Sequence, residues 1–189
     1  MIVYLHGFRS SPESRKATLL REALAARGRA AEYQCPALPP SPRAAIGAVQ
    51  RIIEAVPAAQ LTLIGSSLGG YYATWLAERY GCRAALLNPA IRPQDDLAQY
   101  LGVQKVYGSG DEIDFRREYL TELEAIDTPA ITRPERYFLL AATGDTVIDY
   151  RTMTRKYAGC RQRVIEGSDH ELSDFPQYLD DVLAWCGDN

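Results

Sequence analysis

Three residues that together can activate a serine follow one another in the order Ser67, Asp145 and His170 along this chain. A serine hydroxyl is too weak an acid to attack a carbonyl unaided near neutral pH, so a base must take its proton as the bond forms. Histidine is the usual base, and a carboxylate on its other ring nitrogen holds the correct tautomer. This order predicts acyl-transfer chemistry with Ser67 as nucleophile, Asp145 as orienting acid and His170 as base.

The nucleophile stands at the centre of Gly65-Ser66-Ser67-Leu68-Gly69. The apolar run 61–64 precedes this sequence and apolar residues at helical spacing follow it in 71–80, so the pattern predicts a strand, a sharp turn and a helix. Residues two before and two after the serine must be nearly side-chain-free, and Gly65 and Gly69 meet that demand. We expect Ser67 at the tip of the turn, with the backbone N–H of Leu68 directed at a developing oxyanion.

Only two histidines can serve as the base. His170 lies in a loop containing glycine and serine that follows the predicted strand 161–165, and this loop could deliver the ring to Ser67. His6 ends the predicted strand 2–5, where we expect it to shape a turn. The N–H of Phe8 in that turn is the expected second oxyanion donor, beside that of Leu68.

Three aspartates compete for the role of the acid. Asp145 directly follows a predicted strand, Asp149 lies four residues further at a helix start, and Asp169 is the neighbour of His170. Adjacent side chains usually diverge, so Asp169 is poorly placed to bond the ring. Asp149 has a simpler explanation as a helix N-cap. We therefore prefer Asp145 and keep Asp149 as the alternative.

The elements that must position these residues alternate between strand and helix, which predicts an α/β fold with a mostly parallel sheet of about six strands and helices on both faces. Strands are expected at 2–5, 30–35, 61–64, 83–87, 136–142 and 161–165. Helices are expected after caps at Ser11 and Ser41, and over 71–80, 150–157 and 175–185. Because ligands of such sheets bind at the carboxyl ends of the strands, the candidate residues should meet at one edge.

The alternation breaks between 89 and 135, where the sequence offers helical pieces near 95–101 and 115–126 but no convincing strand. We interpret this segment as a small helical, lid-like insertion over the active edge of a single α/β domain, 1–189. Its many apolar residues would shape an acyl pocket. The alternative, that they only pack the segment onto the sheet, is equally open.

Composition points to a small-molecule partner. The chain has 21 basic and 24 acidic residues, a net charge of −3 and no basic block, which argues against nucleic acid or an anionic membrane as the main partner. No apolar run approaches the roughly 18 residues of a membrane span, and Met1 leads directly into the first strand, so we expect a cytoplasmic location. Four scattered cysteines without a C-x-x-C pair suggest neither a metal site nor a disulfide scaffold.

Several segments resemble the α/β-hydrolase superfamily: His6-Gly7-Phe8, Gly65-Ser66-Ser67-Leu68-Gly69, Thr143-Gly144-Asp145 and Ser168-Asp169-His170. More narrowly, the run from Ile2 to Phe8 and the sequence Gly65 to Gly70 are similar to those of small bacterial YqiA-type esterases. The segments Tyr71-Tyr72-Ala73-Thr74 and Asn88-Pro89-Ala90 extend this resemblance, which covers essentially the whole chain. It implies ester or thioester hydrolysis, with long-chain acyl-CoA among the candidate substrates, and places nucleophile, acid and base at Ser67, Asp145 and His170.

We therefore expect a serine esterase or thioesterase that forms an acyl-enzyme on a small acyl ester or thioester and needs no cofactor or metal. One alternative is a peptidase or amidase with the same three residues, for which Arg116, Arg117 and Glu118 could supply charged contacts. Another is a noncatalytic binding module with this fold, which a fluorophosphonate probe would distinguish from either enzyme. Acyl length, leaving group and oligomeric state stay open.

Overall fold

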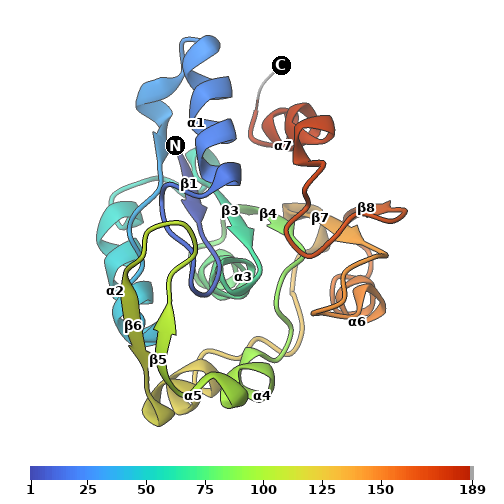
Figure 1. Ribbon diagram of the computed structural model, residues 1–189. Coiled ribbons are helices and arrows are strands. Elements are labelled where there is room, and N and C mark those ends of the chain that lie inside the picture. The colour runs from blue at the N-terminus through green and yellow to red at the C-terminus, as the bar shows by residue number, and fades with distance from the viewer. Residues whose placement is uncertain (188–189) are drawn as a thin grey trace.

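The computed structural model describes residues 1–187 and is built around a six-stranded sheet in the order β2-β1-β3-β4-β7-β8 (Figure 1). All of its neighbouring strands are parallel. The strands are β1 (Ile2–Leu5), β2 (Tyr33–Gln34), β3 (Thr62–Ser66), β4 (Arg83–Leu87), β7 (Tyr137–Ala142) and β8 (Arg161–Ile165). The predicted fold class and strand number are confirmed.

Helices cover both faces of this sheet, so its central strands read as continuous apolar runs. The helices are α1 (Arg15–Ala26), α2 (Pro42–Ile53), α3 (Leu68–Tyr80), α6 (Tyr150–Lys156) and α7 (Leu179–Trp185). Every residue of β1, β3 and β7 is buried. Alternate residues of these strands therefore enter two separate cores, one on each face.

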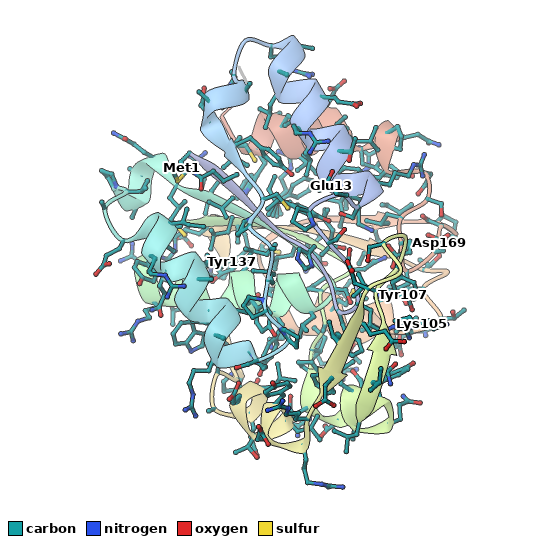
Figure 2. The ribbon with its side chains drawn as sticks, turned by 60° about the vertical axis from the view of Figure 1, so that its left-hand side comes forward. Met1, Glu13, Lys105, Tyr107, Tyr137 and Asp169 are labelled. Atoms are coloured by element: carbon teal, nitrogen blue, oxygen red, sulfur yellow. The ribbon has the colours of Figure 1, made fainter. Side chains whose placement is uncertain are left out.

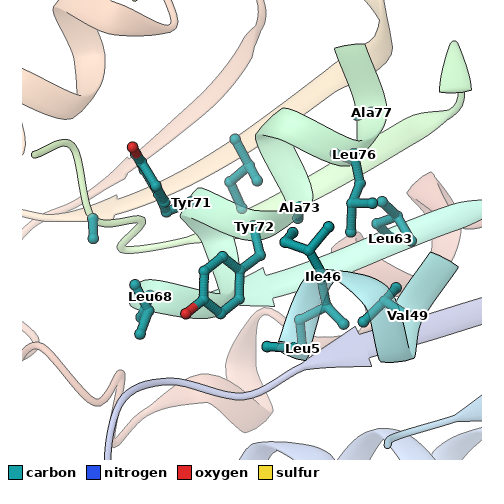
Figure 3. Close-up of a cluster of buried hydrophobic side chains, with 14 of the residues drawn as sticks. Leu5, Ile46, Val49, Leu63, Leu68, Tyr71, Tyr72, Ala73, Leu76 and Ala77 are labelled. Carbon is teal, nitrogen blue, oxygen red and sulfur yellow. The ribbon is translucent and has the colours of Figure 1, made fainter. Parts of the chain in front are cut away.

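Each of the two cores packs against a different set of helices. Leu5 and Leu63 pack with Ile46 and Val49 of α2 and with Leu76 of α3, as the close-up in Figure 3 shows. On the other face, Tyr4 of β1 and Ile64 of β3 form a core with apolar residues of α1 and α7, namely Leu20, Leu24, Val182 and Leu183. In Figure 1, α1 and α7 lie at the top of the view, and α2, α3 and α6 lie below the strands of the sheet.

Two helix starts test the capping predictions. Ser41 caps α2 as predicted, because its hydroxyl accepts the Ala44 N–H at 3.2 Å and Pro42 occupies the first helical position. The cap predicted at Ser11 is wrong, since α1 begins at Arg15 with Ser14 as the preceding residue. Ser11 instead organises a turn, in which its hydroxyl accepts the Glu13 N–H at 3.2 Å.

Two other elements are shorter than predicted. Of the strand expected at 30–35, residues Tyr33 and Gln34 pair with β1, and Ala30–Glu32 form a 3-10 turn. The strand lies at the sheet edge, where one neighbour supplies all its ladder bonds. The last helix was expected over 175–185, but its first residues, Phe175–Gln177, form a 3-10 turn before α7 begins.

The insertion 89–135 is only partly helical, so the prediction of a helical segment without a strand is wrong. It contains α4 (Pro93–Asp96) and α5 (Arg117–Glu124), but also an antiparallel hairpin of β5 (Gly102–Lys105) and β6 (Glu112–Phe115). The sequence carried a short signal for β6, because Ile113 and Phe115 alternate with acidic residues. Gly108 and Gly110, both at positive φ, form the turn between the two strands.

Part of the insertion packs onto the rest of the fold. Phe115 and Leu123 are buried within the core that contains α2 and α3. The hydroxyl of Tyr71, on α3, donates to the carbonyl of Leu123 at 2.8 Å. These contacts fix the base of the hairpin, β5 and β6, beside the carboxyl end of the sheet (Figure 1).

The first turn of α3 approaches β1 so closely that Gly69 has no room for a side chain. A Cβ there would collide with the backbone carbonyl of Leu5, so Gly69→Ala should lower the free energy of unfolding by about 3 kcal/mol or more. Gly47→Ala is the matched control, because its Cβ would meet only the Arg51 guanidinium at 3.7 Å. It should stabilise α2 by about 0.5 to 1 kcal/mol. Urea denaturation measures both; equal effects would contradict this packing.

Candidate active site

The predicted site residues follow their strands at one edge of the sheet. Ser67 directly follows β3, Asp145 lies in the loop after β7 and His170 in the loop after β8. The structure brings these three side chains into one hydrogen-bonded chain. His170 Nε2 lies 3.0 Å from Ser67 Oγ, and His170 Nδ1 lies 2.7 Å from Asp145 Oδ2.

Ser67 sits in a strained backbone conformation at the tip of the turn between β3 and α3. Its φ of 53° and ψ of −120° lie in a region that non-glycine residues rarely adopt. The turn is held by the Ser67 carbonyl, which accepts from the Gly70 N–H at 2.9 Å and from the Ala90 N–H at 3.0 Å. Gly65 and Gly69 are in close contact, as the sequence predicts, because a Cβ on Gly65 would collide with the Gly69 carbonyl.

Asp145 is fixed on both of its carboxylate oxygens. Oδ1 accepts the backbone N–H groups of Val147 and Ile148, each at 2.8 Å, and Oδ2 faces the histidine ring. The Asp145 side chain is fully buried, and that of His170 is 15% exposed. A carboxylate on Nδ1 favours a proton there, which leaves the Nε2 lone pair free to accept the Ser67 proton.

The two rival aspartates have other partners. Asp149 caps α6, with its carboxylate accepting the Arg151 N–H at 2.9 Å. Asp169 accepts the Ser173 hydroxyl at 2.6 Å and the Ser173 N–H at 2.9 Å, and these bonds hold the pKa of Asp169 below its usual value. The geometry therefore favours Asp145 as the partner of His170.

His6, the other histidine, is buried and has two backbone hydrogen-bond partners. Its Nδ1 lies 3.1 Å from the Gly7 carbonyl, and its Nε2 lies 3.2 Å from the Leu38 N–H. Burial lowers the pKa of His6. A neutral ring with its proton on Nδ1 satisfies both contacts, so His6 joins the turn after β1 to the loop around Leu38.

The two predicted oxyanion donors lie on segments that flank Ser67. Leu68 is the first residue of α3, and the first N–H groups of a helix have no partner within it. Gly7, which precedes Phe8, lies against the serine, because a Cβ on Gly7 would be 3.8 Å from Ser67 Oγ. The Phe8 ring packs edge-on against Phe115, with centroids 4.9 Å apart, so β6 supports this turn.

A cavity of about 920 Å³ opens over Ser67 and His170. Apolar side chains line one part of it, namely Phe8, Leu97, Tyr100 and Val147. Hydroxyl and cationic side chains line another part, namely Ser10, Ser11, Ser14, Arg15 and Lys16. Tyr107 and Lys105, on the hairpin that borders the cavity, lie toward the same side of the molecule as Asp169 in Figure 2. The cavity thus offers both apolar and polar surfaces next to the serine.

The three charged residues expected to contact a peptide terminus do not line the cavity. Arg116, Arg117 and Glu118 are exposed, and none of them lines this cavity. Arg116 pairs with Asp114 at 3.0 Å.

Sequence reasoning missed the residues that hold the His170 loop. Asn88 donates to the carbonyls of Asp169 and His170, and Lys16 Nζ donates to the Glu171 carbonyl at 2.5 Å. The available signal for Asn88 was its position directly after β4, since polar residues at that edge of the sheet face the site. Lys16, on α1, carried no such signal.

The described part of the chain, 1–187, contains no group of three or more histidine, cysteine, aspartate or glutamate side chains arranged to hold a metal ion. It contains no helix with the length and apolar character needed to cross a membrane.

Solved structures share this fold over nearly the whole chain. Mouse alpha/beta hydrolase domain-containing protein 10 matches with a TM-score of 0.71 at 16% identity, covering 97% of this chain and 89% of that one. The esterase domain of a Rhodothermus marinus protein matches with a TM-score of 0.69 at 20% identity, covering 97% and 85%. A Paleococcus ferrophilus monoacylglycerol lipase gives 0.69 at 17%, covering 98% and 93%. These matches define an α/β-hydrolase fold.

A family match is more specific. Residues 1–187 match the family described as Uncharacterised protein family (UPF0227), and the chain belongs to that family. The resemblance to YqiA-type proteins is thereby confirmed.

The burial of neutral His6 predicts a dependence of stability on pH. Because the pKa of His6 in the folded chain lies below its ordinary value of 6.5, the unfolded chain takes up the proton first as the pH falls below 6.5. Stability should therefore fall between about pH 6.5 and the lower folded pKa. His6→Gln can still accept the Leu38 N–H but does not titrate. The urea midpoint should fall less from pH 7.5 to pH 5.5 for this variant than for wild type. An equal fall in both proteins would contradict a buried, neutral His6.

Proposed function

We propose that this protein is a serine hydrolase that cleaves small carboxylic esters or thioesters through an acyl-enzyme intermediate. The single observation that carries this proposal is the chain of bonds from Ser67 Oγ through the His170 ring to Asp145, at 3.0 and 2.7 Å. Such an arrangement is the one that general-base activation of a serine requires.

In the first half of the reaction, His170 Nε2 takes the proton from Ser67 Oγ as that oxygen bonds to the acyl carbonyl. Asp145 stabilises the charged imidazolium and keeps its ring oriented, without itself becoming protonated. The tetrahedral intermediate then collapses, the bond to the alcohol or thiol breaks, and the leaving group departs with the proton from His170. The product of this half is an acyl ester on Ser67.

In the second half, His170 takes a proton from a water molecule as the water attacks the acyl-enzyme. Collapse of the second tetrahedral intermediate returns that proton to Ser67 Oγ and releases the carboxylic acid. These steps consume one water and use only side chains and backbone of this chain, so no cofactor or metal enters the proposal.

The negative oxygen of each intermediate is proposed to lie between the N–H groups of Phe8 and Leu68. Support comes from the contact of Gly7 with Ser67 and from the place of Leu68 at the start of α3, where the helix dipole favours negative charge. Loss of one such donor typically costs on the order of 3 kcal/mol of transition-state stabilisation.

The cavity supports an acyl substrate with a polar leaving group. The side chains of Phe8, Leu97 and Tyr100 in its lining suit an apolar acyl chain, and the serine hydroxyls in the same lining suit a polar group. Two of the matched structures are described as an esterase domain and a monoacylglycerol lipase, and the YqiA-type resemblance adds acyl-CoA thioesters as candidates. We further propose that the chain is one domain in which the insertion 89–135 shapes the acyl side of this cavity.

The two alternative functions have less support. Arg116 and Arg117, the cations expected to read a charged peptide end, lie outside the cavity. Two of the cations that do line it, Arg15 and Lys16, donate to the backbone carbonyls of Ser173 and Glu171. A noncatalytic module has no need for a serine held at positive φ within hydrogen-bond distance of a histidine whose other nitrogen faces a buried carboxylate.

Substitution of adjacent serines tests the nucleophile. Ser67→Ala should lower kcat for nitrophenyl esters and acyl-CoA thioesters by at least about 10⁴-fold while the circular dichroism spectrum stays native. Ser66→Ala is the matched control, since Ser66 lines the same cavity one residue earlier, and it should keep kcat within a few-fold. A Ser67→Ala variant with wild-type activity would eliminate the proposal. A series of acyl lengths and of amide analogues identifies the preferred substrate.

A second substitution series tests the acid. Asp145→Asn should lower kcat about 10⁴-fold, because an amide on Nδ1 no longer favours the tautomer that accepts the serine proton. Asp149→Asn and Asp169→Asn should keep kcat within a few-fold, since these carboxylates bond α6 and Ser173. A larger loss in Asp149→Asn than in Asp145→Asn would transfer the role to Asp149.

A further inference from the structure

Asn88 occupies a fully buried position between the two loops that carry the acid and the base. It directly follows β4, and its side-chain amide Nδ2 donates to the Asp169 carbonyl at 3.0 Å and to the His170 carbonyl at 3.1 Å. Its Oδ1 accepts the N–H of Ala142, the last residue of β7, at 2.9 Å. One amide therefore links the backbone of His170 to the end of the strand that leads into Asp145.

The residue type fits this place closely. Asn88 has a φ of 43°, in the left-handed region that asparagine tolerates better than most residues. The partners dictate the orientation of the amide, because two carbonyls need a donor and one N–H needs an acceptor. Aspartate has nearly the same shape but would direct an oxygen at both carbonyls, and glycine would keep the backbone conformation but lose all three bonds.

The loop that Asn88 holds is itself strained, so its position depends on external contacts. Ser168 and Leu172, on either side of His170, have φ values of 58° and 50°. From the side of α1, Arg15 donates to the Ser173 carbonyl and Lys16 to the Glu171 carbonyl, each at 2.5 Å. These two cations hold residues after His170, whereas Asn88 bonds the carbonyl of His170 itself.

We propose that Asn88 is a positioning residue that sets the location of the His170 ring relative to Ser67 and Asp145. This inference rests on the proposed function, since it concerns the geometry of the same base. Its action is indirect: the amide fixes the His170 backbone, and the backbone fixes the distance from Nε2 to the serine. A displacement of about 1 Å at such a base can cost on the order of 100-fold in rate.

The experiment compares Asn88→Asp and Asn88→Gly with wild type on a nitrophenyl ester. Both variants should lower kcat by about 10- to 100-fold with KM changed less than about threefold, because the cavity that binds the substrate stays intact while the base is displaced. The rate of reaction with a fluorophosphonate should fall in parallel with kcat.

Thr74→Val is the matched control for a merely structural effect. Thr74 is as buried as Asn88 and bonds the Tyr157 hydroxyl at 2.7 Å and the Gly70 carbonyl at 2.8 Å, without contact to the His170 loop. This variant should lower the melting temperature and leave kcat near wild type. Asn88 variants that lose melting temperature as Thr74→Val does, but keep wild-type kcat, would overturn the proposal.

A measurement on the wild-type protein answers the same question if neither Asn88 variant folds. Attachment of a phosphonyl group to Ser67 replaces the partner of His170 Nε2, so the nitrogen and proton resonances of the Asn88 side-chain amide should shift. Unchanged amide resonances would show that Asn88 is not coupled to the ring, and would overturn the proposal. If the wild-type protein does not react with the probe at all, the proposed function fails and this inference falls with it.

Discussion

The close contact between the first turn of α3 and strands β1 and β3 is the constraint on which the site depends. A side chain at Gly65 or Gly69 would occupy the space of backbone atoms. The helix can therefore begin directly after the strand only because both positions are glycine. That abrupt start forces Ser67 to positive φ and leaves its hydroxyl at the carboxyl edge of the sheet. The other features of the site, from the proposed oxyanion donors to the cavity, lie around this hydroxyl.

Burial of the Asp145 carboxylate strengthens its electrostatic effect on the His170 ring. Asp145 is removed from water but keeps bonds to two backbone N–H groups and to the His170 ring, which compensate the cost of burying a carboxylate. A fixed anion in a region of low dielectric would stabilise the imidazolium of the proposed mechanism more strongly than a solvated anion would. His6, the second histidine, has no such anionic partner among its hydrogen bonds, and its burial favours the neutral form of its ring.

The sequence predicted the parts of this fold that local patterns determine. Strands β4 and β8 have the predicted bounds, and the alternation of strand and helix predicted the order in which Ser67, Asp145 and His170 reach one edge. The hairpin of β5 and β6 was missed because its strands have only four residues each, and its hydrophobic residues are divided between solvent and core. The hydrogen bonds of the Asn88 side chain are made to residues more than 50 positions away, so a local pattern does not encode these partners.

We propose that Ser67 becomes a nucleophile because His170 removes its proton beside two backbone donors. A crystal structure of the protein after reaction with a fluorophosphonate tests this mechanism. We expect a covalent bond from Ser67 Oγ to phosphorus, with the phosphoryl oxygen within hydrogen-bond distance of the Phe8 and Leu68 N–H groups. Absence of an adduct, or an adduct on another residue such as Ser66, would rule this mechanism out.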